Sequence, residues 1–181
     1  MDSTYYVKLS EAWGELLSTH QWDKFCTFTY SDSVWSTEKV ARDFKTMHYR
    51  ASAQTLGLSR HNKSLKRLHA NEALPPYILA IEPHRSGTLH AHALVGIAEP
   101  KAARGNSTLT KEILETTWKD NIRHAGFTSI SSVSKNDSAV AYMVKTSRYL
   151  AKNPNAYLDW YGLGNRYSLH PVSTSKVKQS A

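Results

Sequence analysis

The sequence predicts an α+β fold built on a central antiparallel sheet, and three observations lead to that class. Hydrophobic residues make up 40% of the 181 residues and charged residues 21%, which is ordinary for a globular protein. Short segments rich in β-branched and aromatic residues predict four strands. Longer segments with apolar residues at spacings of three and four predict helices between and around them. The strands are expected at 24–30, 75–82, 88–97 and 127–134.

The N-terminal part predicts a helix, a strand and a second helix. Residues 8–19 form an amphipathic pattern, and the segment KFCTFTY (24–30) has strand composition. Ser36 is a typical N-cap for the helical segment that follows, 37–54. Residues 57–74 are polar and basic, and the sequence leaves open whether they form a loop or a short helix.

The middle of the chain predicts a hairpin and a helix. Two prolines introduce the strand at 75–82, the segment PHRSG (83–87) turns the chain, and 88–97 returns as the next strand. After a polar link, residues 110–126 predict a helix that Gly126 ends.

The C-terminal part predicts a strand and a tyrosine-bearing helix. The strand at 127–134 alternates, and Asn136 or Asp137 can cap a helix over 137–152. The order β-α-β-β-α-β-α resembles the ferredoxin-like split βαβ arrangement with an added C-terminal helix. We expect one domain over residues 1–181, with 153–181 as an extension whose end can be flexible.

Charge and cysteine content bound the partners and the compartment. The formal net charge of +8 makes a polyanion such as nucleic acid a natural partner. The single cysteine, Cys26, excludes an internal disulfide. No apolar run reaches the roughly 20 residues that a membrane span needs, and the first residues lack the layout of a secretion signal. We therefore expect a cytoplasmic protein without membrane contact.

The segment GTLHAHALVGI (87–97) places two histidines on one face of a strand, because side chains alternate along a strand. His90 and His92 can hold one divalent ion together, and the hairpin is expected to return Glu82 beside them as a third ligand. His84 is the rival third ligand. Each histidine alone is more simply explained as an ordinary hydrogen-bonded residue.

The helix at 137–152 carries two Tyr-x-x-Lys units on one side. At 100° per residue, Tyr142, Lys145, Tyr149 and Lys152 lie opposite the apolar arc around Val140. The units can be a solvated face. Alternatively, a tyrosine oxygen can attack a phosphodiester while a lysine one turn away stabilises the phosphate charge.

Three motifs in order resemble the HUH endonucleases, which include the rolling-circle replication initiators (Rep proteins) of plasmids, bacteriophages and single-stranded DNA viruses. They are the FTFTY strand at 25–30, the His-hydrophobic-His motif at 90–92, and Tyr142 with Lys145. The motifs occupy a core of about 24–152.

The resemblance implies a reaction and its cofactor. A Mg²⁺ or Mn²⁺ ion on His90, His92 and Glu82 activates a phosphate of single-stranded DNA, and Tyr142 attacks it. The products are a free 3′-hydroxyl and a 5′-phosphotyrosine link. Thr27 and Thr29 are expected beside the metal strand as supports or DNA contacts.

Two features depart from the family pattern. The second tyrosine unit begins seven residues after the first, so Tyr149 lies about 10 Å along the helix axis and is only an alternative or second nucleophile. The chain also has no phosphate-binding loop of helicase type, so an initiator of this kind would recruit a separate helicase.

Several residues are candidate DNA contacts. The basic cluster can bind an origin hairpin or be a solvated loop, and Lys152 can contact DNA from the tyrosine helix. The cluster comprises Arg60, Lys63, Lys66 and Arg67. Three C-terminal aromatics can stack on bases, although core packing is the simpler use; they are Trp160, Tyr161 and Tyr167.

Two other classes fit parts of the pattern. An RNA-recognition module shares the βαββαβ order and stacks bases on strand aromatics, for which Phe25, Phe28 and Tyr30 are candidates. However, histidines stand where that module needs aromatics on its third strand. A transposase or conjugative relaxase with the same tyrosine chemistry is the other alternative.

Overall fold

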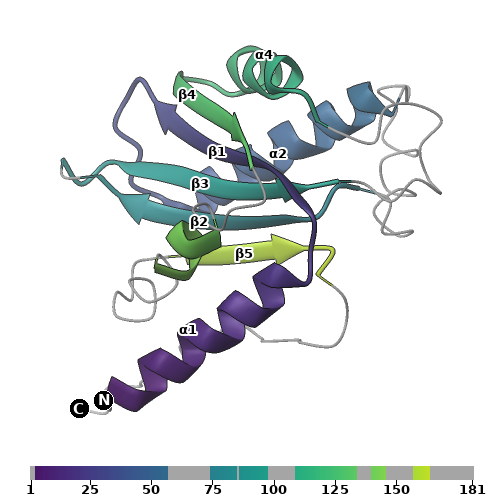
Figure 1. Ribbon diagram of the computed structural model, residues 1–181. Coiled ribbons are helices and arrows are strands. Elements are labelled where there is room, and N and C mark those ends of the chain that lie inside the picture. The colour runs from purple at the N-terminus through teal and green to yellow at the C-terminus, as the bar shows by residue number, and fades with distance from the viewer. Residues whose placement is uncertain are drawn as a thin grey trace, which may run out of the picture.

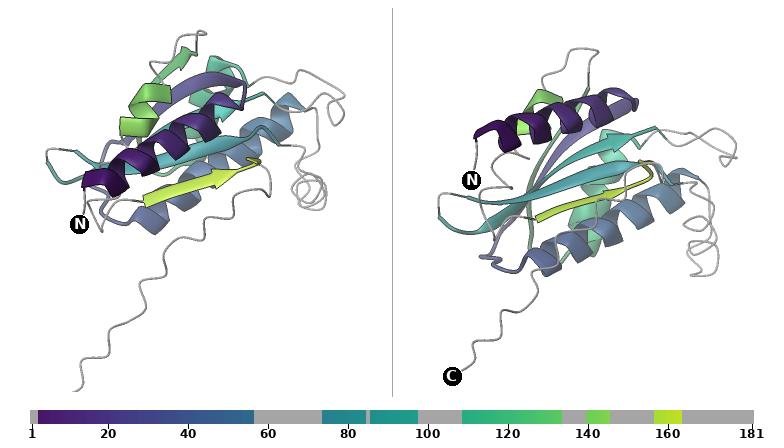
Figure 2. Two further views of the ribbon diagram at one scale, coloured as in Figure 1. Left: turned by 60° about the horizontal axis from the view of Figure 1, so that its bottom comes forward. Right: turned by 90° about the horizontal axis from the view of Figure 1, so that it is seen from below.

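A computed structural model gives the fold and describes residues 3–56, 74–84, 86–97, 109–133, 140–145 and 157–163. A single antiparallel sheet lies between two helical layers (Figures 1 and 2). Helices α2 (Thr37–Thr55) and α4 (Lys111–Asn121) cover one face. Helix α1 (Ser3–Ser18) and a helical segment at 140–145 lie on the other.

The sheet has five strands in the order β4-β1-β3-β2-β5, and every neighbouring pair is antiparallel. Its first four strands have the order of the split βαβ arrangement, so the predicted α+β fold class is confirmed. The bounds are β1 (Trp22–Tyr30), β2 (Tyr77–Pro83), β3 (Leu89–Gly96), β4 (Ala125–Ser132) and β5 (Tyr157–Tyr161).

The two sheet faces bury different residues because side chains alternate along each strand. On β1, Cys26 and Phe28 point into the larger core, under α2 and α4. Their neighbour Phe25 points to the opposite face, where it packs against a smaller cluster that includes Trp13 of α1 and Met143. The same alternation places His90 and His92 on the face of the smaller cluster.

Helix α2 begins where the sequence predicts. The side chain of Ser36 accepts a hydrogen bond from the backbone N–H of Lys39, 3.1 Å away, which satisfies one of the unpaired donors of the first turn. Helix α4 has an equivalent cap, in which Thr110 accepts from the N–H of Ile113.

Helix α4 does not extend to Gly126, so that prediction is wrong. The helix ends at Asn121, His124 takes the positive φ of 62° at the turn, and Gly126 already belongs to β4. Gly126 is needed for close approach rather than for capping, since a Cβ there would lie 2.6 Å from the backbone carbon of Tyr30.

The segment after the tyrosine helix contains a fifth strand that the sequence did not predict. Strand β5 pairs with β2 at the edge of the sheet. Trp160 packs edge-on against Trp13, and Tyr161 stacks on Tyr77, so both serve the core as the simpler interpretation held. Residues 57–73, which include the basic cluster, lie outside the described residues, as does Tyr167. Within the described ranges, no helix is long and apolar enough to span a membrane.

Candidate active site

The hairpin of β2 and β3 places Glu82 directly across from His90. The backbone N–H of His84 donates to the carbonyl of Thr88, and that of Gly87 donates to the carbonyl of His84, both at 2.7 Å. Gly87 adopts a φ of 85°, which glycine reaches at little cost. The turn therefore sets the register that brings the carboxylate to the histidines.

His90, His92 and Glu82 form a compact group of nitrogen and oxygen donors. The Nε2 atoms of the two histidines lie 2.9 Å apart, and one ligand atom from each of the three residues lies within 4.8 Å of the others. His92 is 8% exposed, whereas Glu82 and His90 are half-buried. His84 is exposed, and its ring centre lies 5.9 Å from that of His90.

The geometry fits a single divalent ion. Two nitrogens bound at right angles to one ion at about 2.1 Å lie about 3.0 Å apart, close to the observed separation. The Nδ1 atom of His90 is buried without a hydrogen-bond partner among the described residues, which a self-contained packing pair would not leave. Two imidazoles and a carboxylate without a thiolate suit Mn²⁺ and similar ions, whereas Mg²⁺ prefers oxygen ligands.

Thr27 of β1 holds the outer nitrogen of His92. The two residues face each other across β1 and β3, and the Thr27 Oγ1 lies 3.0 Å from the Nδ1 of His92. With the proton on Nδ1 donated to this hydroxyl, the lone pair of Nε2 is directed to the group above. This is the outer support that metal-binding histidines usually have.

Burial keeps both histidines neutral. Desolvation, followed by the nearby charge of His90, lowers the pKa of His92 to about 4. Desolvation also lowers the pKa of His90, although Glu82 opposes that shift. Neutral imidazoles offer their lone pairs at neutral pH, which a metal ligand requires.

Tyr142 projects from the segment at 140–145 onto the histidines. Its Oη lies 3.1 Å from the Nε2 of His92, and its ring packs edge-on against Phe25 and His92 with centroids 5.3 and 5.0 Å away. The helical projection placed Tyr142 opposite the core. In the structure it shares the sheet-facing side with buried Met143, because this segment lies directly on the histidine face.

Lys145 is exposed one turn after Tyr142. The remaining candidate residues lie outside the described residues, so their place beside the group stays a prediction. They are Tyr149, Lys152, Arg60, Lys63, Lys66 and Arg67.

Two features of the site were not predicted from the sequence. The sequence suggested Thr27 as a support but not its bond to His92, which follows only from the β1–β3 register. Phe127, 72% exposed on β4, carried no sequence signal, because a phenylalanine in a strand is ordinarily interpreted as core.

Comparison with known proteins gives one finding. The family model described as replication-associated protein ORF2/gene II protein matches residues 23–154, which include β1, the histidine pair and Tyr142. Comparisons with curated proteins and with solved structures gave no significant match.

Proposed function

The chain belongs to the replication-associated protein ORF2/gene II protein family, and from this membership we propose that it is an HUH endonuclease that nicks single-stranded DNA to start rolling-circle replication. The family supports a role as a replication initiator. The observation that carries the chemistry is the 3.1 Å contact between the Tyr142 hydroxyl and a histidine of the donor group.

In this proposal, His90, His92 and Glu82 hold Mn²⁺ or Mg²⁺. When bound, the ion polarises the phosphate and offsets the negative charge that develops on it. Thr27 keeps the Nε2 of His92 available as a ligand atom. Burial of the histidines keeps them unprotonated, so that protons compete weakly for the ligand nitrogens.

Tyr142 is the proposed nucleophile. Its oxygen forms a bond to the scissile phosphorus and loses the phenolic proton, while the bond from phosphorus to the 3′ oxygen breaks and that oxygen gains a proton. The products are a 5′-phosphotyrosine and a free 3′-hydroxyl, and a later 3′-hydroxyl can reverse the step. Contacts with Phe25 and His92 fix the ring in place before the substrate arrives.

Lys145 is proposed to stabilise the phosphate charge from one helical turn away. Lys152 and the basic cluster of Arg60, Lys63, Lys66 and Arg67 are proposed DNA contacts, with an origin hairpin as the partner. Tyr149 remains the alternative nucleophile. A separate helicase is a proposed partner, because the sequence contains no helicase phosphate loop.

Two other functions share parts of this site. A transposase or relaxase would use the same tyrosine chemistry, but the family match supports replication. A binding module without chemistry would need neither the paired histidines nor a tyrosine hydroxyl against them. Formation of a covalent adduct separates the module from all of the nucleases.

The test is an adduct assay with Tyr142→Phe. The protein is mixed with labelled single-stranded DNA of randomised and candidate origin sequences, with Mn²⁺ or EDTA, and resolved on a denaturing gel. We expect a metal-dependent adduct in the wild type that is lost in Tyr142→Phe, which removes only the nucleophilic oxygen.

Tyr157→Phe is the matched control, because Tyr157 lies on β5 and packs on the opposite face of the sheet. That variant should form the adduct normally. An adduct that persists in Tyr142→Phe would move the nucleophile to another tyrosine, with Tyr149→Phe as the next variant. Binding of RNA or DNA without any adduct would support the binding module instead.

A further inference from the structure

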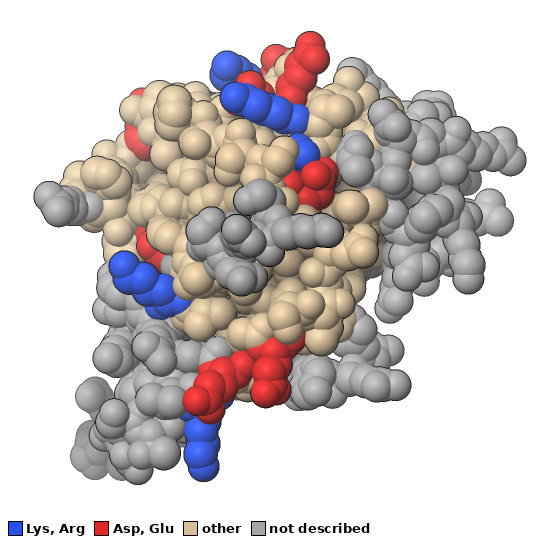
Figure 3. Space-filling model, viewed as in Figure 1, with Lys and Arg blue, Asp and Glu red and all other residues tan. Residues whose placement is uncertain are grey.

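The sheet face that carries the histidines is covered over only part of its width. Over β2 and β3, Ile78 and Leu94 are buried in the cluster with Trp13 and Met143. On β4, at the opposite edge, the residues on this face are exposed: Phe127, Ser129 and Ser131. Figure 3 shows this side of the molecule, with uncharged side chains over most of it and charged ones gathered at its upper edge.

Phe127 is the most conspicuous residue of this open part. Its side chain is 72% exposed, and its carbonyl accepts a 2.8 Å hydrogen bond from the Thr29 hydroxyl, which fixes the backbone beneath the ring. An exposed phenylalanine gains nothing from burial, so a fixed one on an edge strand points to a contact with another molecule.

The open part is continuous with the candidate active site. Ser129 on β4 pairs with Thr27 on β1, and Thr27 pairs with His92 on β3. Two strand spacings separate Ser129 from His92, or about 10 Å, which about three nucleotides span at their spacing in a duplex strand. A single strand with its phosphate at Tyr142 can therefore reach Phe127.

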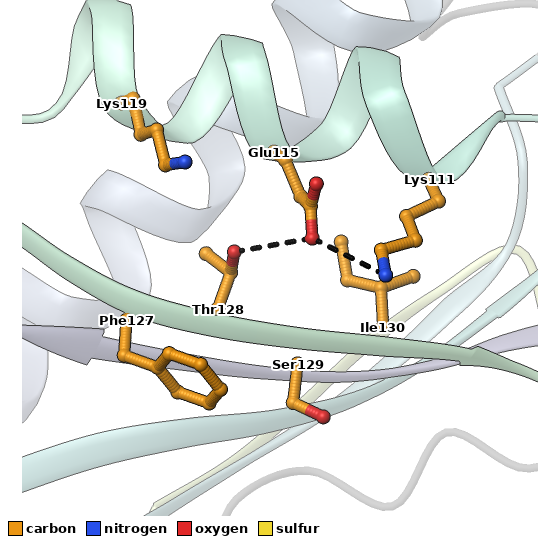
Figure 4. A pocket seen from close by; sticks show the side chains of 7 residues that line it. All are labelled: Lys111, Glu115, Lys119, Phe127, Thr128, Ser129 and Ile130. Carbon is orange, nitrogen blue, oxygen red and sulfur yellow. Dashed lines mark hydrogen bonds and ion pairs between the residues drawn. The ribbon is translucent and has the colours of Figure 1, made fainter.

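The outer side of the same strand is positively charged. A hollow of about 380 Å³ lies between α4 and β4, and Lys111, Lys119 and Phe127 are among its lining residues (Figure 4). Glu115 lies 3.8 Å from Lys111 and 3.5 Å from the Thr128 hydroxyl. Within the described part of the chain, no carboxylate pairs with Lys119, whose ammonium group is directed toward β4 in Figure 4.

We propose that this β4 edge surface, defined as Phe127, Ser129, Lys111 and Lys119, binds the single-stranded DNA that flanks the cleaved phosphate. One base stacks on the Phe127 ring, and a backbone phosphate lies at Lys119. The inference rests on the proposed function, since it names where the substrate strand runs beside that site. An aromatic face next to a cation is the combination that single-strand binding proteins use.

Charge favours DNA over a second copy of this chain as the occupant. A partner strand pairing with β4 would bring the lysines of two copies, each with a formal charge of +8, toward one another. A DNA strand is complementary to this charge and needs only the small serine side chains between Phe127 and Thr27 to pass across the sheet.

The test measures binding separately from cleavage, in EDTA. A mixed-sequence single strand of about 30 nucleotides carries 2-aminopurine at one position at a time, and its fluorescence reports stacking. We expect quenching at one or two neighbouring positions. Phe127→Ser should remove this quenching and weaken binding about 5- to 100-fold, whereas Phe127→Tyr should retain both.

Charge is tested with Lys119→Ala against Lys8→Ala, which removes the same charge from an exposed position on α1. Only Lys119→Ala should reduce the salt dependence of binding appreciably. The inference is overturned if Phe127→Ser binds like the wild type, if both lysine variants behave alike, or if no single strand binds. Loss of self-association in Phe127→Ser by sedimentation, with DNA binding unchanged, would assign the surface to a second copy.

The two proposals fail in distinguishable ways. A Tyr142-dependent adduct that forms with unchanged DNA affinity in Phe127→Ser would keep the nuclease and reject the β4 edge surface. Phe127-dependent stacking without an adduct on any sequence would keep the surface and reject the nuclease. Thermal unfolding of each variant checks that these exposed substitutions leave the fold intact.

Discussion

A single hydroxyl on β1 determines which nitrogen of His92 faces the candidate metal site. Thr27 Oγ1 lies 3.0 Å from Nδ1, and the opposite nitrogen, Nε2, lies 2.9 Å from His90 and 3.1 Å from Tyr142. If Nδ1 gives its proton to Thr27, Nε2 carries a lone pair toward both neighbours. Thr27 is thus a positioning residue that acts through His92.

We expect Thr27→Val to weaken Mn²⁺ binding about 10- to 100-fold, because valine keeps the shape but removes the partner of Nδ1. Isothermal titration calorimetry measures the affinity, and ¹⁵N NMR of the metal-free protein should show a shift of the His92 proton from Nδ1 toward Nε2. Thr29→Val is the control two residues along the same face, where the hydroxyl bonds to Phe127 instead. Equal Mn²⁺ affinity in the wild type and Thr27→Val would contradict this role.

At the residue scale, the sequence predicts proximity better than it predicts roles. Alternation along β3 is sufficient to place His90 and His92 on one face, and a short hairpin is sufficient to return Glu82 to them. The packing of Tyr142 could not be predicted, since a helical projection gives angles around an axis but not what the helix lies on. The orphaned Nδ1 of His90 likewise depends on three-dimensional packing.

At the scale of elements, the β2–β3 turn transmits backbone geometry to the site. Gly87 has a φ of 85°, and a Cβ at this position would lie 2.6 Å from Cζ3 of Trp35. We expect Gly87→Ala to lower the free energy of unfolding by about 1–3 kcal/mol and to weaken Mn²⁺ binding by shifting Glu82 relative to His90. Urea unfolding and calorimetry measure the two effects.

The control for this substitution is Gly14→Ala in α1, where a Cβ would meet nothing within 4 Å. That change should leave Mn²⁺ binding unaltered and stabilise the helix by about 0.5–1 kcal/mol. Adding Trp35→Ala to Gly87→Ala should recover the steric part of the loss but not the part due to φ. Unchanged stability and Mn²⁺ affinity in Gly87→Ala would show that the turn does not set the register.

Element boundaries were predictable where local chemistry determines them. The cap at Ser36 is such a case, because the side chain bonds to a backbone group three residues away. The end of α4 is different, since Gly126 is required by the backbone of Tyr30, which is distant in sequence. Strand β5 was missed because its five residues form a strand by pairing with β2, which no local pattern reveals.

For the whole molecule, the uneven covering of the sheet is what gives the fold a usable face. Helices α2 and α4 bury one side over the larger core, whereas α1 and the segment at 140–145 leave β4 open on the other. The donor group lies at the boundary between the covered and the open parts. It is therefore buried enough to keep His92 neutral and still close to a surface that a DNA strand can reach.

A donor group shared by β2 and β3 couples metal binding to the stability of the whole sheet. An ion that binds only the folded chain stabilises it by about 2.7 kcal/mol at 100 times its Kd, which corresponds to a rise of about 5–10 °C in Tm for a chain of this size. We expect this rise with Mn²⁺, a smaller one with Mg²⁺ at the same concentration, and its reversal by EDTA, all measured by differential scanning calorimetry.

The ligand variants make this a test of which residues hold the ion. His90→Gln and Glu82→Gln should lose the rise in Tm, whereas His84→Gln should keep it, since His84 is exposed at the margin of the group. The opposite result for Glu82 and His84 would make His84 the third ligand. A rise that persists in all three variants would show that the ion stabilises the protein elsewhere, because no single donor of the group would then be needed for it.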